Sequence, residues 1–193
     1  MNNTKQSNVH MIVFTGLCMA LCVVLPLAFH FIPNAGTVLC PMHIPVLICG
    51  LVCGWQFGLL CGIMGPVLSF LLTGMPSAAA LPSMIVELAI YGTAAALMMK
   101  LIHTKSAYAD LYISLISSMV IGRIVAGIVK ALFFARGEIT IATWATAYFV
   151  TCLPGIAVQL VFIPSVIVAL QRARLLPPRY EEKKNSDEEF EED

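Results

Sequence analysis

Three charged side chains lie inside apolar segments of this chain, and they are the residues most expected to have a chemical function. Glu87, Arg123 and Lys130 each interrupt a long run of hydrophobic residues. A charge inside a membrane costs roughly 2.5 to 3.5 kcal/mol on insertion scales, so it normally faces a partner or a water-filled cavity. One acid and two bases leave one positive charge over. This set favours a binding site for a small anion or polar solute.

Two structural interpretations compete with a ligand site. Lys130 would extend its ammonium group toward the membrane surface, and Glu87 with Arg123 would form a permanent ion pair. Gln159 lies near the middle of the last apolar run, where its amide would contact a solute or make a hydrogen bond between helices. His43 opens the second apolar run and completes the candidate substrate-binding set. A single histidine beside a loop is no convincing metal ligand, so no metal site is expected.

The sequence carries no motif for catalysis. It lacks the G-x-x-x-x-G-K-[ST] phosphate loop, and neither H-E-x-x-H nor G-x-S-x-G occurs. Glu87 has no second acid beside it in the apolar runs, so a catalytic carboxylate pair is missing. Seven cysteines are present without a C-x-x-C pair, and buried cysteine usually behaves as a small hydrophobic residue. We therefore expect no enzyme activity and no cofactor.

Composition places the chain in the membrane class. Hydrophobic residues make up 59% of the 193 residues, charged residues 11%, and the mean hydropathy is +0.89. Soluble domains contain about 25% charged residues. The apolar runs therefore have to position the charged residues within a bilayer.

The number of crossings depends on one ambiguous segment. Apolar runs of about 20 residues, enough for one span, occur near 11–29, 82–102, 109–134 and 147–170. The uncharged stretch 44–72 is too long for one straight span and short for two. A break within Gly54–Gly58 gives six crossings. Lys and Arg in short loops mark the cytoplasmic side, and six crossings place all loop and terminal bases except Arg136 inside.

The fold class predicted is therefore an all-α, polytopic membrane protein with six transmembrane helices and cytoplasmic amino and carboxyl termini. The external connections would be 30–42, 73–81 and 135–143, rich in Pro, Gly, Ser and Thr. Residues 1–175 would form the membrane domain. Residues 176–193 hold eight of the eleven acids, and their charge density predicts a disordered cytoplasmic tail.

Small residues recur every four positions in the first three apolar segments. This spacing lets helices approach closely in a membrane. Either internal packing or docking to a partner membrane subunit would use it. The residues concerned are Gly16, Ala20, Gly50, Gly54, Gly58 and Gly62.

The stretch from Pro41 to Gly92 resembles the substrate-binding S components of energy-coupling factor (ECF) vitamin transporters. The resemblance rests on the H-I-P-V opening of the second helix, the glycine-rich second and third helices, the T-G-M-P loop and the E-L-x-x-Y-G of the fourth. It extends from the first helix to the last. In place of the A-x-x-x-A pattern frequent in the family's first helix, this chain has Gly16 and Ala20.

The resemblance implies an ATP-driven importer in bacterial plasma membranes, in which this chain captures a vitamin or related micronutrient. Its implied partners are a transmembrane T component and two cytosolic ATPases, with no nucleic acid. The small-residue face of helices one to three would meet the T component. The solute site would lie between the external loops and helices four to six, and a pantothenate-like acid suits the excess positive charge.

Two further hypotheses remain. A stand-alone carrier would use Glu87 to couple transport to a proton or sodium ion, and its uptake would persist without an ATPase. A membrane enzyme or assembly protein would not transport at all. A small molecule that stays bound through purification would count against pure assembly.

Overall fold

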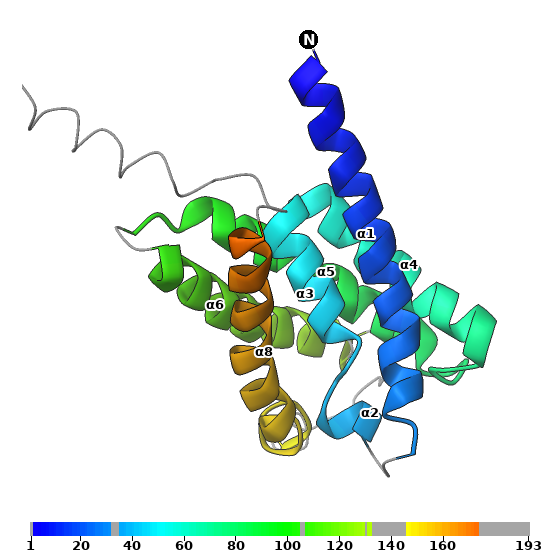
Figure 1. The fold of residues 1–193 in the computed structure, drawn as a ribbon. Coiled ribbons are helices and arrows are strands. Elements are labelled where there is room, and N and C mark those ends of the chain that lie inside the picture. The colour runs from blue at the N-terminus through cyan, green and yellow to red at the C-terminus, as the bar shows by residue number, and fades with distance from the viewer. Residues whose placement is uncertain (1, 32–34, 105–106, 130, 133–145, 174–193) are drawn as a thin grey trace, which may run out of the picture.

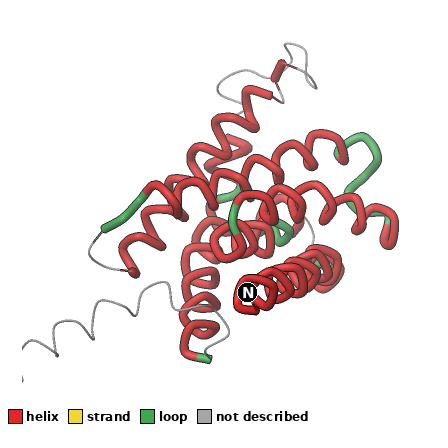
Figure 2. Tube along the Cα trace, turned by 90° about the horizontal axis from the view of Figure 1, so that it is seen from above, coloured by secondary structure: helices red, strands yellow, loops and turns green. Residues whose placement is uncertain are grey.

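The computed structural model describes residues 2–31, 35–104, 107–129, 131–132 and 146–173. Helices joined by loops make up this part of the chain, which contains no strand (Figures 1 and 2). The predicted all-α class is thereby confirmed. Its elements are α1 (Asn2–Ala28), α2 (Ala35–Val38), α3 (His43–Cys53), α4 (Trp55–Thr73), α5 (Leu81–Leu101), α6 (Ala107–Val129), the π-helical η2 (Thr146–Thr151) and α8 (Leu153–Arg172).

Five of the described helices, α1, α4, α5, α6 and α8, are long and apolar enough to cross a membrane. Helix α3 has 11 residues, which at 1.5 Å each gives about 16 Å, short of a bilayer core of about 30 Å. The described residues thus supply five full-length candidate spans and one shorter apolar helix.

The last helix begins later than the predicted run near 147–170. Residues Thr146–Thr151 are π-helical, and α8 starts at Leu153 with Pro154 in its first turn. Proline suits this position because the first turn has no intrahelical partner for its missing N–H group. Lys130, the external connection 135–143 and the predicted tail 176–193 lie outside the described residues.

The chain reverses direction at Gly54, inside the predicted break. Gly54 has φ of 94°, a backbone conformation that favours glycine because it has no Cβ. A Cβ placed on Gly58 would lie 2.9 Å from the Cα of Gly50. Eight residues of continuous helix would separate these two positions by about 12 Å. Helices α3 and α4 therefore form a hairpin rather than one tilted helix.

Four glycines bring the α3–α4 hairpin against α5 at backbone contact distance. A Cβ on Gly50 would lie 2.3 Å from the carbonyl oxygen of Gly92, and one on Gly92 would lie 2.3 Å from that of Gly58. A Cβ on Gly62 would lie 2.5 Å from the carbonyl oxygen of Leu88. The four-residue glycine pattern thus serves internal packing in this part of the molecule.

Helix α3 occupies the centre of the bundle. It packs against α1, α4, α5 and α8, and Figure 1 shows it between α1 and α8. One buried cluster joins α3 to α5, α6 and α8 through residues such as Leu47, Tyr91 and Leu115. A second joins it to α1 and α4 and contains the cysteines Cys18, Cys22, Cys49, Cys53 and Cys61. A helix surrounded in this way can hold a side chain at its first turn in a fixed place.

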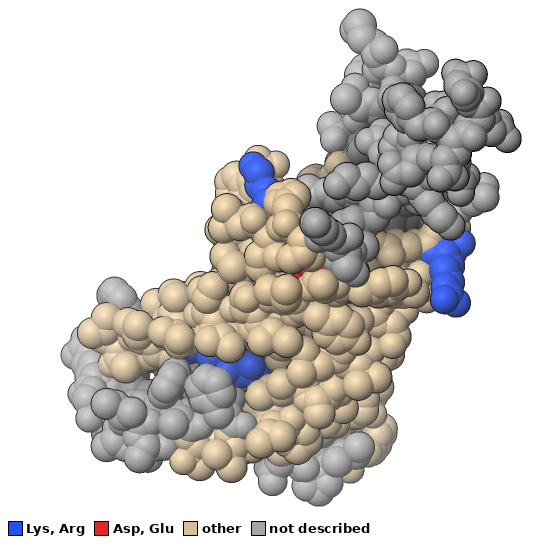
Figure 3. All heavy atoms as spheres, turned by 90° about the vertical axis from the view of Figure 1, so that its left-hand side faces the viewer, with Lys and Arg blue, Asp and Glu red and all other residues tan. Residues whose placement is uncertain are grey.

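The outer surface is apolar where lipid would cover it. Exposed hydrophobic side chains follow the outward faces of the helices, among them Val13 on α1, Ile124 on α6 and Val161 on α8. In Figure 3 the described atoms on the visible face are mostly uncharged, with Lys and Arg restricted to a few places. This distribution is typical of a membrane-embedded bundle.

Candidate functional site

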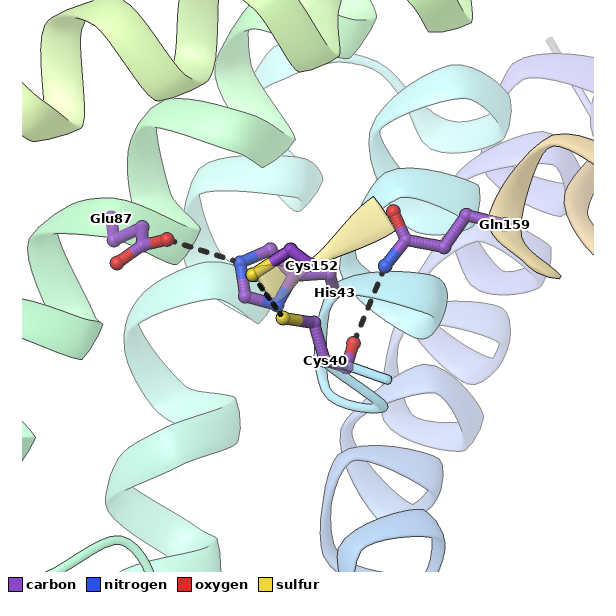
Figure 4. A network of polar contacts seen from close by, with 5 residues as sticks. All are labelled: Cys40, His43, Glu87, Cys152 and Gln159. Carbon is purple, nitrogen blue, oxygen red and sulfur yellow. Dashed lines mark hydrogen bonds and ion pairs between the residues drawn. The ribbon is translucent and has the colours of Figure 1, made fainter. Parts of the chain in front are cut away.

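Glu87 and His43 form the centre of the candidate site. Glu87 lies in the second turn of α5, and His43 is the first residue of α3. Nε2 of His43 lies 3.4 Å from Oε1 of Glu87, and the two side chains are 9% and 18% exposed. Figure 4 shows the imidazole directed toward the carboxylate. The pair joins the start of α3 to the start of α5.

Tyr91 holds the imidazole from the side. It follows Glu87 by one helical turn and is 1% exposed. Its ring meets that of His43 edge to face, with centroids 4.9 Å apart. Nδ1 of His43 is buried and has no hydrogen-bond partner among the described residues. The imidazole therefore has a fixed orientation with one polar atom still available for a contact.

Arg123 approaches this cluster from α6. A Cβ on the preceding Gly122 would lie 2.7 Å from the ring of Tyr91. Glycine at this position lets α6 come close to α5, and it places Arg123 next to the contact. Arg123 is 5% exposed, so its guanidinium is directed into the protein rather than toward lipid. A role for Arg123 in solute binding stays a prediction.

The loop between α2 and α3 packs on the first turns of α8. A Cβ on Gly155 would lie 2.5 Å from the carbonyl oxygen of Val38. Nε2 of Gln159 lies 3.5 Å from the carbonyl oxygen of Cys40. The thiol of Cys40 donates to that of Cys152, with 3.7 Å between the sulfurs (Figure 4). Gln159, which is 1% exposed, thus binds a loop carbonyl.

The charged residues of the site affect the two thiols. The hydrogen bond from Cys40 lowers the pKa of Cys152 to about 6, burial opposes this, and Arg123 and His43 assist. The pKa of Cys40 is raised, first by its bond to Cys152 and then by burial. Glu87 raises it further, whereas Arg123 lowers it. Both charges therefore act on the same thiol, which places them at the same end of the bundle.

Four of the five predicted substrate-binding residues, Glu87, Arg123, Gln159 and His43, lie at this end of the bundle. The fifth, Lys130, lies outside the described residues. Tyr91 and Cys152 were not among the predicted site residues. The sequence could have indicated Tyr91, because this residue follows Glu87 at i+4 and so shares its helix face. It could not have indicated Cys152, because its neighbour Cys40 is 112 residues away in the chain.

The predicted docking residues fall into two groups. Gly16 and Ala20 are exposed on α1, and a Cβ on Gly16 would meet nothing within 4 Å. Gly50, Gly58 and Gly62 are buried at the contact with α5, and Gly54 forms the turn. Docking stays a prediction for all six, and α1 is the helix that presents its small residues outward.

An open groove of about 380 Å³ lies elsewhere, between the start of α6 and the end of α8. Its lining includes Tyr108, Tyr112 and Arg172. Tyr108 precedes Arg123 by 15 residues of α6, or about 22 Å along the axis. The groove is therefore separate from the candidate site.

The polar groups of the site can bind a solute. The described residues contain no group of three or more His, Cys, Asp or Glu side chains that could hold a metal ion. A buried guanidinium binds carboxylate or phosphate through charge-assisted hydrogen bonds. A carboxylate accepts hydrogen bonds from hydroxyl or amide groups. The arrangement suits a solute that carries an anionic end and neutral donors.

Comparison with known proteins gives one family. The model of the family described as "ECF transporter, substrate-specific component" matches residues 10–169. No curated protein matches this chain, and no solved structure matches it.

Proposed function

The chain belongs to the family of substrate-specific components of ECF transporters, and we propose that it captures an anionic vitamin or related micronutrient at the outer face of the membrane. Family membership and the five apolar helices make it a multi-pass protein of the cell membrane and the substrate-binding subunit of its transporter. The proposal adds the charge of the solute, its side of entry and the residues that contact it.

Burial of Arg123 is the observation that carries this proposal. A guanidinium keeps its charge under all physiological conditions, and within a membrane such a charge normally faces a functional partner. Arg123 is 5% exposed, and the preceding Gly122 packs on the ring of Tyr91. Lys130, seven residues later in the sequence, lies outside the described residues and supplies the second positive charge. Together they exceed the charge of Glu87 by one, which an anionic group of the solute would balance.

The neutral part of the solute would contact the residues around Glu87. The carboxylate would accept a hydrogen bond from a hydroxyl or amide of the solute, while His43 holds it in place. Nδ1 of His43 and the amide of Gln159 supply further polar contacts. Tyr91 restricts the imidazole to one orientation, so the site loses little freedom when the solute binds.

The direction of the helices supports an outward-facing site. His43 and Glu87 stand near the starts of α3 and α5, and Gln159 stands near the start of α8. Lys100 and Arg172 lie in the last turns of α5 and α8. Since basic residues favour the cytoplasmic side, the candidate site lies at the external end. This assignment treats the short α3 as a sixth crossing and keeps both termini cytoplasmic.

Import would require the partners that the family implies, a transmembrane T component and two cytosolic ATPases. The exposed small residues Gly16 and Ala20 on α1 would allow a partner helix to approach closely. Residues 1–175 would act as the membrane domain, with 176–193 as a cytoplasmic tail.

Separate replacement of Arg123 and Lys130 by Met tests the proposal. Solute binding to purified protein would be measured by calorimetry with a panel of acidic and neutral vitamins. We expect a Kd for an acidic vitamin that rises at least tenfold in Arg123→Met, because a hydrogen bond to a charged group contributes about 1.5 to 3 kcal/mol. Ile116→Leu, an exposed change on the same helix, serves as control.

Unchanged affinity in both Met variants, or tight binding of a neutral vitamin by all proteins, would contradict an anionic solute. Uptake in cells distinguishes the transport mechanism. Loss of uptake on removal of the ATPases supports the ECF arrangement, whereas uptake that continues and follows an ion gradient supports a stand-alone carrier.

A further inference from the structure

Cys40 and Cys152 are the two half-buried cysteines of this chain, and their sulfurs lie 3.7 Å apart. The other five cysteines are buried within the bundle. Cys40 belongs to the loop before α3, and Cys152 directly precedes α8. In the orientation proposed above, both face the external medium, where disulfide bonds persist.

The backbone around the two thiols is already held together. Gly155 approaches the carbonyl oxygens of Val38 and Leu39 so closely that a Cβ would lie within 3 Å of each. Gln159 binds the carbonyl oxygen of Cys40. Sulfurs in a disulfide are about 2.05 Å apart, so side-chain rotation has to close the remaining gap while the segments keep their places.

Cys40 itself has an uncommon backbone conformation. Its φ is 47°, in the left-handed region that non-glycine residues rarely adopt. Such a conformation persists where surrounding contacts determine it. The Cys40 thiol is directed toward Cys152 (Figure 4).

We propose that Cys40 and Cys152 form a reversible disulfide that fastens the α2–α3 loop to α8 beside the solute site. The external oxidant is a low-molecular-weight disulfide such as oxidised glutathione. This inference uses the external orientation given under Proposed function, but the bond itself requires no solute.

The reaction proceeds by two thiol–disulfide exchanges. The Cys152 thiolate attacks one sulfur of the oxidant, forms a mixed disulfide and releases one glutathione thiolate. The Cys40 thiol then loses its proton to solvent and attacks Sγ of Cys152, which releases the second glutathione thiolate. Both leaving thiolates take up protons. The two protein thiols are oxidised by two electrons, and one disulfide of the oxidant is reduced to two thiols.

The low pKa of Cys152, about 6, makes it the attacking thiol at neutral pH. Its hydrogen bond from Cys40 is the main cause, with help from Arg123 and His43. The thiolate is the nucleophilic form of cysteine. Cys40, whose pKa is raised, acts as the resolving thiol.

The bond would restrict exchange of solute. His43 follows Cys40 by three residues, and Gln159 binds the Cys40 carbonyl, so this loop adjoins two of the candidate contacts. A covalent link to α8 would limit the loop's separation from the bundle. Oxidised protein should therefore release and take up solute more slowly than reduced protein.

Intact-mass measurement of the wild-type protein after treatment with oxidised glutathione is the direct test. We expect the loss of two hydrogen atoms in mass, a linked peptide that contains Cys40 and Cys152, and reversal by dithiothreitol. Thermal denaturation should shift upward by roughly 5 °C, because the link closes a long loop in the unfolded chain.

Two variants complete the design. Cys40→Ser should stop at the mixed disulfide on Cys152, whereas the control Cys61→Ser should form the bond as wild type does. A linked peptide from another pair, such as Cys18 with Cys49, would overturn the proposal. So would a stable mixed disulfide in wild-type protein. If the bond forms without any effect on solute exchange, the disulfide is confirmed. The proposal that it slows solute exchange is then overturned.

Discussion

Nε2 of His43 and Oε1 of Glu87 lie 3.4 Å apart at the ends of two different helices. This contact joins α3 to α5 close to the loop that precedes α3. His43, whose ring packs against Tyr91, therefore positions the carboxylate of Glu87. Glu87 on α5 and Arg123 on α6 then lie toward one end of the bundle, and Arg123 is buried rather than facing lipid.

Replacement of Glu87 by Gln keeps the shape of the side chain and removes its charge. We expect solute affinity to fall about tenfold, because a hydrogen bond to a carboxylate is roughly twice as strong as a neutral one. Calorimetry on purified protein measures this. Thr93→Val on the same helix, whose hydroxyl bonds to its own helix at Ala89, should bind normally. Equal affinity of wild type and Glu87→Gln would exclude contact with the carboxylate.

The glycine contact between α4 and α5 should be sensitive to a single methyl group. In Gly62→Ala the new Cβ would lie 2.5 Å from the carbonyl oxygen of Leu88, and overpacking costs typically about 1 to 3 kcal/mol. We expect the thermal midpoint in detergent to fall by roughly 5 °C. Gly36→Ala, with nothing within 4 Å of its Cβ, should denature like wild type. Similar midpoints for both variants would contradict the close approach of these helices.

The exposed small residues of α1 should matter for assembly and not for solute binding. Gly16→Leu adds a large side chain where the described chain has nothing within 4 Å. We expect the variant to fold and bind solute but to lose co-purification with the T component. Ala157→Leu, an equivalent change on an exposed position of α8, should still co-purify. Retention of the partner by Gly16→Leu would remove α1 from the docking surface.

Alkylation of Cys152 should follow an unusual pH dependence. Since the pKa of this thiol is lowered to about 6, its reactive thiolate is present above that pH and disappears below it. The rate of modification by iodoacetamide, followed by peptide mass spectrometry, should reach half its maximum near pH 6. Cys40→Ala removes the main cause of the shift, so the midpoint should move toward higher pH. A wild-type midpoint near the ordinary cysteine value, about 8.5, would contradict the thiol contact.

Much of the helical architecture could be predicted because apolar run length and charge are local properties of the sequence. The break near Gly54 was predictable from a run too long for one span. The surface against which the glycine pattern packs was not predictable. Small residues every four positions make any helix face compact, and the sequence does not say whether α5 or another protein occupies it.

Residues of the site were predictable where a membrane charge revealed them. Glu87 and Arg123 stand out because their burial is costly. The pairing of His43 with Glu87, and of Cys40 with Cys152, depends on how the loop before α3 folds back on the bundle. Partners separated by 44 and 112 residues leave no periodic signal in one sequence.

The most direct test of an anionic solute is native mass spectrometry of the protein as purified from its own cells, in wild-type form and as the Arg123→Met, Lys130→Met double variant. We expect a small organic acid bound to the wild-type protein and absent from the variant. A neutral molecule bound equally to both proteins would contradict it.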